Sequence, residues 1–415
     1  MAGCFQNHDT SPFVPPRERW LLLTIAGIQF THILDFMIMM PLGPQFTRLF
    51  GISDAQFGLL VSAYTFSAGL SGLAAATYVD RFDRKRLLLV LYALFALATL
   101  ACGLAPGYAF LMGARIAAGL FGGVLSALSQ TIVADVVPFE RRGRAMGIVM
   151  SSFSFSTVAG VPMGLFLASH WGWQLPFLVI AGLSAALALA AAATLPPLRG
   201  HLLARDRPSA WRAIGRVLAS ANHQRAFGFS ALLVFAGFCV IPFITIYLQS
   251  NAGVRPEQVP YIYLIGGVTT LVTARWIGRL TDRKGKVPVF RALALVVTVP
   301  VLAMTLLQPW PLPVILLVTT TLFVFLSGRM IPGMALITGA AEPNLRGTFM
   351  ALNGAVQSAS MGLASFLAGL IIGRDASGQV QHYWVAGLIG VGASLASVAV
   401  ARRLVVHSTA SHRPG

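Results

Sequence analysis

The sequence consists largely of apolar runs about 20 residues long, and this feature limits the folds open to it. A helix of that length crosses the hydrocarbon core of a bilayer, where each backbone hydrogen bond must be made within the protein. Apolar residues make up 56% of the 415 positions and charged residues only 10%, whereas soluble domains carry about 25% charged residues. We therefore predict an all-α membrane protein with twelve transmembrane helices, at residues 19–41, 56–79, 86–105, 109–133, 144–168, 173–195, 226–249, 258–280, 287–307, 313–337, 347–373 and 381–402.

Basic residues are distributed unevenly between the two sides of this arrangement. Of the 30 Lys and Arg, 24 fall on the side of both termini. The other six lie within spans or on the far side: Arg115, Arg275, Arg329, Arg48, Arg255 and Arg374. This asymmetry follows the positive-inside rule, so both termini are expected in the cytoplasm. Anionic lipid headgroups, rather than nucleic acid, are the expected partner of the net charge of +17.

Two pairs of similar loops divide the chain into halves. DRFDRKR (80–86) after the second span matches DRKGK (282–286) after the eighth, and PFERRGRA (138–145) matches PNLRGTF (343–349). Repeated halves are typical of secondary transporters. We predict two pseudo-symmetric six-helix bundles at residues 19–195 and 226–403. The remaining segments are expected in the cytoplasm: an N-terminal tail 1–18, a linker 196–225 and a C-terminal tail 404–415.

One part of the linker has the pattern of an amphipathic helix. Apolar residues from Trp211 to Leu218 share a helical face opposite Arg212 and Arg216, after a candidate cap at Ser209. We predict a short helix on the cytoplasmic membrane surface. A disordered basic linker is the alternative.

The basic loops resemble those of the major facilitator superfamily, in particular its twelve-span drug/proton antiporter branch. ATYVDRFDRKR (76–86) is similar to the family pattern Gly-x-x-x-Asp-Arg-x-Gly-Arg-Lys, with Ala76 and Asp83 at the glycine positions. GRLTDRKGK (278–286) keeps both glycines. The resemblance implies a cytoplasmic gate formed by Asp80, Arg81, Arg84, Lys85, Gly278, Asp282, Arg283 and Gly285. In that gate Asp80 faces the eleventh span and Asp282 the fifth; the alternative is that these charges only set the topology.

Two further motifs resemble the same family. LMGARIAAGLFGG (111–123) places Arg115 in the fourth span, ahead of glycines spaced for close helix packing. AGVPMG (159–164) places Gly160, Pro162 and Gly164 in the fifth span and is similar to a motif of antiporters, which has glycine and proline adjacent. The resemblance favours antiport, although the residues themselves require only a bent, closely packed helix.

Asp35 is the one residue among the 13 acids that lies deep within a predicted span. The first span has a single polar face, formed by Thr24, Gln29, Thr31, His32 and Asp35. Asp35 and Arg115 lie at similar depths from the same surface, and the family places their spans around a central cavity. We predict that the two side chains face each other, because an unpaired charge is costly there. Asp35, Arg115 and His32 are the candidate proton-coupling residues, with a structural role for His32 equally open.

Four more polar residues are candidates for lining a substrate cavity: Gln29, Arg329, Asn353 and Gln357. Arg329 has the alternative of extending to the cytoplasm, as Arg275 is expected to do. Asn353 and Gln357 lie four apart on one helical face, where hydrogen bonding between helices is the alternative.

Together these observations predict a secondary active transporter, a proton-coupled antiporter that exports small amphipathic drugs or metabolites by alternating access. A symporter or facilitator for sugars or similar solutes is the first alternative, and a transporter-like membrane sensor is the second. The three cysteines and eight histidines form no metal-binding spacing, and the sequence contains no catalytic motif. We expect no cofactor, no metal and no enzyme activity, and a monomer in a bacterial inner membrane.

Overall fold

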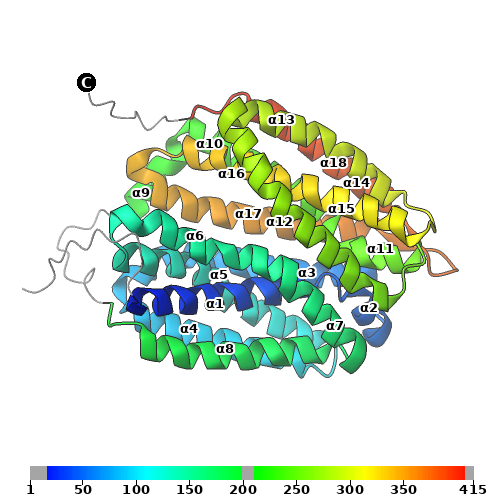
Figure 1. Cartoon of the computed structure of the whole chain (residues 1–415), viewed down its shortest axis with the longest axis horizontal. Coiled ribbons are helices and arrows are strands. Elements are labelled where there is room, and N and C mark those ends of the chain that lie inside the picture. Colours follow the sequence, from blue (N-terminus) through cyan, green and yellow to red (C-terminus); the bar gives the residue numbers. More distant parts are fainter. Residues whose placement is uncertain (1–15, 199–209, 407–415) are drawn as a thin grey trace, which may run out of the picture.

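Two bundles of helices, one from each half of the chain, lie side by side with α17 along their boundary (Figure 1). The computed structural model describes residues 16–198 and 210–406. We call the end where α1 begins and α18 ends the termini end. The opposite end, with α2, α11 and the antiparallel pair β1–β2, is called the hairpin end. This architecture confirms the predicted all-α arrangement of two six-helix halves.

The first half consists of α1 (Pro16–Ile38), α2 (Gly43–Phe50), α3 (Asp54–Tyr78), η1 (Val79–Arg81), α4 (Arg84–Gly103), α5 (Tyr108–Val136), α6 (Phe139–Phe155), η2 (Ser156–Gly160), α7 (Val161–Trp171) and α8 (Gln174–Thr194). In the linker, α9 (Ala210–Ala219) forms where the sequence predicts a short helix, while Ser209 lies outside the described residues. Its Val217 is buried, and Arg212 and Arg216 are exposed.

The second half consists of α10 (Ala221–Phe238), η4 (Ile241–Phe243), α11 (Ile244–Ser250), η5 (Pro256–Gln258), α12 (Val259–Lys284), α13 (Lys286–Val296), α14 (Thr298–Thr305), α15 (Leu312–Gly328), α16 (Met330–Ala340), η6 (Pro343–Leu345), α17 (Arg346–Ile371), β1 (Gly373–Arg374), β2 (Val380–Gln381) and α18 (Tyr383–Ala401).

Prolines determine where several spans are interrupted. A proline lacks the N–H that would bond the carbonyl four residues earlier, and its ring clashes with that carbonyl. Accordingly α10, α13 and α15 each end four residues before a proline, at Pro242, Pro300 and Pro332 respectively. In the fifth span the π-helix η2 ends two residues before Pro162, so the span is bent there without being broken.

Eleven helices in the described residues are long and apolar enough to cross a membrane. The predicted eighth span, α12, has 26 residues but is more polar, with Thr269, Thr270, Thr273 and Arg275 along its length. It packs against α15 of its own half and against η2 and α7 of the other half. These contacts place α12 within the bundle, so it completes the set of twelve spans.

The hydrophobic core joins the two halves at the hairpin end and is divided at the termini end. One cluster contains buried residues of both halves, such as Phe57 and Phe243, whose ring centroids lie 5.9 Å apart. A second cluster runs from Leu21 to Leu195 within the first half, and a third runs from Val217 to Ala401 within the second. The structure is therefore closed at the hairpin end.

Small residues allow α3 and α17 to approach closely along the boundary. A Cβ at Gly58 would lie 2.7 Å from the Ser365 carbonyl oxygen, and Ser62 donates a hydrogen bond of 2.7 Å to the Gly362 carbonyl. Because these contacts involve backbone carbonyl oxygens, they determine the distance between the axes of the two helices.

Candidate functional site

A buried ion pair joins α1 to α5 within the first half. Arg115 Nη1 donates to Asp35 Oδ2 at 2.8 Å and to the Asp35 carbonyl oxygen at 3.3 Å. Thr99 Oγ1 on α4 donates to the other carboxylate oxygen at 3.2 Å. Both charged side chains are 0% exposed. The structure thus brings together the two residues that the sequence predicts to face each other, and each charge has a partner in the low-dielectric interior.

The ring of Tyr64 on α3 lies against this ion pair. The guanidinium carbon of Arg115 is 4.3 Å from the ring centroid, which is a cation–π contact. Such a contact is worth about 2 kcal/mol when both groups are desolvated. Nε and Nη2 of Arg115 have no hydrogen-bond partner in the described part of the chain, so the ring is a main contact of the guanidinium face. Sequence reasoning missed Tyr64.

Glycines on α5 make the space that Tyr64 occupies. A Cβ at Gly119 would lie 2.4 Å from the Tyr64 carbonyl oxygen, and a Cβ at Gly122 would lie 2.9 Å from the Tyr64 hydroxyl. Gly123 is equally close to α3, since its Cβ would lie 2.3 Å from the Ala68 carbonyl oxygen. The glycine spacing was the one signal in the sequence that a residue of another helix lies beside Arg115.

His32 lies near the ion pair but not within it. The Asp35 carboxylate is bonded by Thr99 and Arg115, and His32 Nδ1 has no hydrogen-bond partner among the residues described. The imidazole packs instead beside the rings of Phe95 and Tyr64, at centroid distances of 5.8 and 6.5 Å. A role for His32 in proton coupling therefore stays a prediction.

The rest of the polar face of α1 is used for contacts inside the first half. Gln29 Nε2 donates to Ser126 Oγ on α5 at 3.0 Å, and the hydroxyls of Thr31 and Tyr92 lie 2.7 Å apart. Gln29 is 1% exposed. In this structure, which is closed at the hairpin end, its side chain therefore belongs to the helix packing and does not line an open surface.

The charges of the first basic loop connect α4 to its neighbours. Arg84 forms an ion pair with Asp135 at the end of α5, and Lys85 Nζ donates to the carbonyl oxygens of Ala192 and Leu195 at 2.7 and 2.6 Å. Those carbonyls lie at the C-terminus of α8, where a cation is favourable. Arg81 is exposed. The side chain of Asp80 lies outside the described structure, so its contact with the eleventh span stays a prediction.

The two basic loops turn by different means. In the first, Asp83 is the N-cap of α4, with φ −58° and a side chain that accepts hydrogen bonds from the N–H groups of Lys85 and Arg86. In the second, Gly285 occupies the corresponding place with φ +89°, a region that favours glycine. Asp83 therefore replaces the family's glycine by capping rather than by adopting its backbone conformation.

The other residues of the second loop lie at the surface. Asp282 and Arg283 are exposed at the end of α12, and Gly278 is half-buried with open space around its Cα. Arg275 is also exposed, and its extension to the cytoplasmic surface stays a prediction. The gate role of this loop remains a prediction.

The fifth-span motif brings η2 and α7 close to α1. A Cβ at Gly160 would lie 2.9 Å from the Leu34 side chain, and one at Gly164 would lie 2.7 Å from that of Ile38. With Pro162 between them, these residues form a bent helix packed on the span that carries Asp35. The sequence requires no more of this motif than a bent, closely packed helix. The link of the motif to antiport stays a prediction.

Arg329 lies inside the second half at the junction of α15 and α16. It is 2% exposed, and its guanidinium donates to Ser394 Oγ at 3.0 Å and to the Leu233 carbonyl oxygen at 3.1 Å. The side chain therefore points into the bundle and does not extend to the termini end. Its hydrogen bonds join α10 and α18 to the break between α15 and α16.

Gln357 and Asn353 on α17 are also buried or half-buried. Gln357 Nε2 donates to Ser230 Oγ on α10 at 2.9 Å, which is the interhelical bond named above as its alternative role. Asn353 is 1% exposed, and its Oδ1 has no partner in the described residues. Among the described residues no hydrogen bond joins either side chain to Arg329 or to the Asp35 pair.

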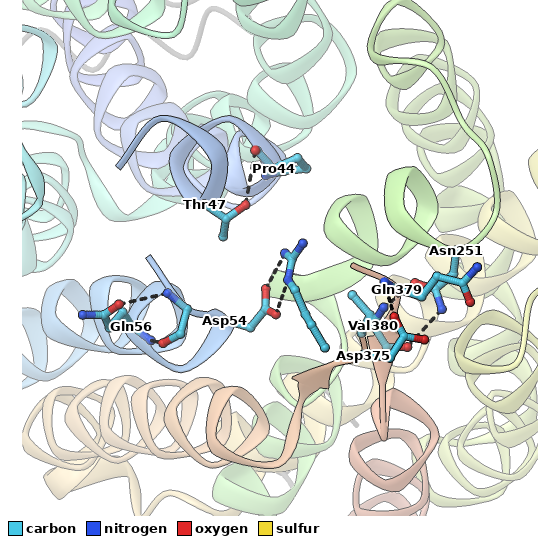
Figure 2. A network of polar contacts seen from close by, with 10 residues as sticks. Pro44, Thr47, Asp54, Gln56, Asn251, Asp375, Gln379 and Val380 are labelled. Carbon is cyan, nitrogen blue, oxygen red and sulfur yellow. Dashed lines mark hydrogen bonds and ion pairs between the residues drawn. The ribbon is translucent and has the colours of Figure 1, made fainter. Parts of the chain in front are cut away.

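A third ion pair, which sequence reasoning missed, joins the two halves at the hairpin end. Arg374 of β1 donates to both carboxylate oxygens of Asp54, from Nε at 2.8 Å and from Nη2 at 2.9 Å. The Asp54 side chain is 2% exposed and lies at the start of α3, with the hairpin residues Asp375, Gln379 and Val380 beyond it (Figure 2). These hydrogen bonds raise the pKa of Arg374 above its ordinary value.

The hairpin that carries Arg374 is held by its own hydrogen bonds. Asp375 accepts bonds from the Ser377 hydroxyl at 2.6 Å and from the Gln379 N–H at 2.9 Å, and they hold its pKa below the usual range, with Ser377 having the largest effect. Asn251 exchanges two bonds with the backbone of Val380, at 2.9 and 3.0 Å (Figure 2). Arg374 is therefore presented to Asp54 by a preformed turn.

The fold and these sites define a class, a polytopic helical membrane protein with two similar halves and a charged pair buried inside one of them. The chain belongs to the Major Facilitator Superfamily, whose model matches residues 25–365. It is a membrane transporter and not an enzyme. The family resemblance of the sequence motifs is thereby confirmed.

Similar proteins include bacterial transporters of known and unknown substrate. The uncharacterized MFS-type transporter YtbD of Bacillus subtilis (strain 168) is 25% identical over 376 residues, which is 90% of this chain and 93% of that protein. A chloramphenicol efflux pump of Mycobacterium tuberculosis (strain ATCC 25618 / H37Rv) is 26% identical over 277 residues, 66% of this chain and 65% of the pump.

Solved structures share the fold. A bacterial homolog of the human lysosomal transporter Spinster, inward-facing and occupied, has a TM-score of 0.75 and 17% identity, over 96% of this chain and 100% of that one. A D-xylose-proton symporter has a TM-score of 0.72 and 20% identity, over 91% and 96%. At these identities the likeness concerns the fold alone.

Proposed function

We propose that this chain is a proton-coupled antiporter that exports small amphipathic compounds across a bacterial inner membrane, with both termini in the cytoplasm. The observation that carries the proposal is the Asp35–Arg115 pair, 0% exposed and bonded at 2.8 Å. A membrane-buried carboxylate balanced by one arginine changes its protonation state when the surrounding solvation changes. Asp35 is therefore the proton carrier, and Arg115 is the charge that the proton competes with.

The closed hairpin end supports alternating access by movement of one half against the other. The cores of the halves merge at that end, where Asp54 and Arg374 also pair, and are separate at the termini end. With the termini in the cytoplasm, this is an inward-facing form. Rocking the halves about the boundary between α3 and α17 would break the hairpin-end contacts and expose the site to the other side.

Relatives and one sequence motif support export as the direction of transport. Relatives named as a chloramphenicol efflux pump and a multidrug resistance protein favour export of small compounds. The symporter with the same fold favours no direction, because likeness at 20% identity concerns architecture only. The AGVPMG motif in the fifth span supports antiport by its resemblance to that of antiporters.

The decisive experiment measures transport by the purified protein in vesicles under an imposed pH gradient. A compound-sensitivity screen of cells lacking or overproducing the protein first identifies the compounds to use. Asp35→Asn should lose gradient-driven accumulation, because its amide cannot carry the proton. A gradient of one pH unit supports about tenfold accumulation per proton exchanged, so the loss is large. Exchange of labelled for unlabelled compound at equal pH should remain.

The matched control is Glu257→Gln, which removes an exposed acid at the hairpin end. It should transport as the wild type does. Undiminished gradient-driven transport in Asp35→Asn would rule out the role of Asp35. Accumulation in the same direction as proton movement would make the chain a symporter.

A further inference from the structure

Four planar groups from four helices form a continuous stack that begins at the buried ion pair. The guanidinium of Arg115 on α5 lies 4.3 Å from the ring centroid of Tyr64 on α3. Tyr64 stacks on Phe36 of α1 at 5.2 Å and an interplanar angle of 24°. Phe36 stacks on Phe238 of α10 at 6.1 Å and 22°. Phe238 belongs to the second half, so the stack connects the ion pair to the other bundle.

The ring of Tyr64 is placed to hold Arg115 when Asp35 carries no charge. Only Nη1 of Arg115 bonds to Asp35, while Nε and Nη2 have no hydrogen-bond partner in the described part of the chain. When the carboxylate is protonated, the guanidinium stays desolvated and loses its ionic partner. A ring face then provides an attraction that does not depend on the charge of Asp35.

We propose that Tyr64 is a positioning residue of the proton-coupling site, which keeps Arg115 in place while Asp35 is protonated. This inference rests on the proposed function. The ionisable groups that face Arg115 come from three elements besides its own: Asp35 and His32 from α1, Tyr64 from α3 and Cys102 from α4. Asp35 is the one acid among them, so no second carboxylate in the described part of the chain takes over when it is neutral.

The remainder of the stack ties this position to the arrangement of the halves. Phe36 follows Asp35 in the sequence, and Phe238 is the last residue of α10, four residues before Pro242. Movement of the second half therefore displaces Phe238 from Phe36, which changes the support of the Tyr64 ring. Through this contact the state of the halves acts on the guanidinium and thus on the proton carrier.

The test compares Tyr64→Phe and Tyr64→Leu in two modes of transport by the full chain in vesicles. Gradient-driven transport requires Asp35 to gain and lose its proton in each cycle. Exchange at equal pH does not require Asp35 to change its protonation state. Tyr92→Leu is the matched control, because it removes a buried tyrosine that stacks on Phe95 and bonds Thr31. Size-exclusion chromatography verifies that each variant is folded before transport is measured.

We expect Tyr64→Phe to resemble the wild type in both modes, since it keeps the ring. Tyr64→Leu should keep exchange but lose gradient-driven transport by about tenfold, the factor that corresponds to about 1.4 kcal/mol. Tyr92→Leu should change both modes by the same factor.

Three outcomes would overturn the inference: equal loss of both modes in Tyr64→Leu, full gradient-driven transport in Tyr64→Leu, or failure of Tyr64→Phe to rescue. Either result for Tyr64→Leu would mean that the ring has no role specific to proton coupling. A defect in Tyr64→Phe would mean that the hydroxyl, and not the ring face, is required. These failures differ from failure of the proposed function, in which Asp35→Asn itself keeps gradient-driven transport.

Discussion

Gly119 is the residue that decides how closely α3 approaches the helix carrying Arg115. A Cβ there would lie 2.4 Å from the backbone oxygen of Tyr64, so Gly119→Ala must separate the two helices. We expect a loss of stability of about 1–3 kcal/mol, as for overpacked sites, together with reduced gradient-driven transport. The measurement is thermal unfolding of the purified protein in detergent, followed by the vesicle assay.

The same helix contains a control for this substitution. Gly113 has open space where its Cβ would stand, so Gly113→Ala should be neutral or slightly stabilising, in keeping with the better helix propensity of alanine. If both variants melt like the wild type, close approach of α3 and α5 at Gly119 is not a requirement of the fold.

At single positions the sequence predicted charges better than it predicted rings. Asp35 and Arg115 could be paired in advance because a buried charge requires a partner and their depths agree. Tyr64 could not, because an aromatic residue in an apolar helix is ordinary, and its position over Arg115 depends on the packing of α3 against α5.

At the scale of elements, one ion pair adds to the apolar contacts between the two halves by joining the hairpin to α3. Asp54→Asn keeps the shape of the side chain but removes its charge and one of its two bonds with Arg374, 2.8 and 2.9 Å long, because an amide nitrogen cannot accept. The arginine side chain is 34% exposed, so we expect a cost of about 1 kcal/mol and a several-fold shift towards hairpin-open forms. Distances between spin labels on α2 and α11 measure that shift.

Charge reversal gives this experiment its control. The double variant Asp54→Arg with Arg374→Asp restores opposite charges and should recover most of the closed population, while either reversal alone should open the hairpin end further. A closed population that is the same in the wild type, Asp54→Asn and both reversals would show that the apolar cluster alone holds that end together.

Helix ends could be predicted where they depend on nearby residues. Contacts between segments far apart in the sequence could not. The breaks of α10, α13 and α15 follow from prolines four residues downstream, although unbroken spans are predicted at 226–249, 287–307 and 313–337. Asp83 shows the limit of pattern matching, because a residue that departs from a glycine pattern proved to be a helix cap. The β1–β2 hairpin carried no apolar or periodic signal, so its contact with α3, over 300 residues away, was not visible in the sequence.

For the whole molecule, the helix that most needs a test is α12. Its threonines and Arg275 make it less apolar than the other eleven, yet the two-fold design requires it to cross the membrane. If it does, Glu257 at its start and Asp282 near its end lie on opposite sides. We expect Glu257→Cys to react with a membrane-impermeant thiol reagent from outside intact cells, and Asp282→Cys to react only after the membrane is opened.

This labelling requires a chain without its three native cysteines, two of which are buried. The charge distribution predicts the outcome, since a Lys and Arg excess on the side of both termini places the basic loop of Asp282 in the cytoplasm. Labelling of Asp282→Cys from outside intact cells would place the termini end outside the cell. The structure would then be an outward-facing form instead of an inward-facing one.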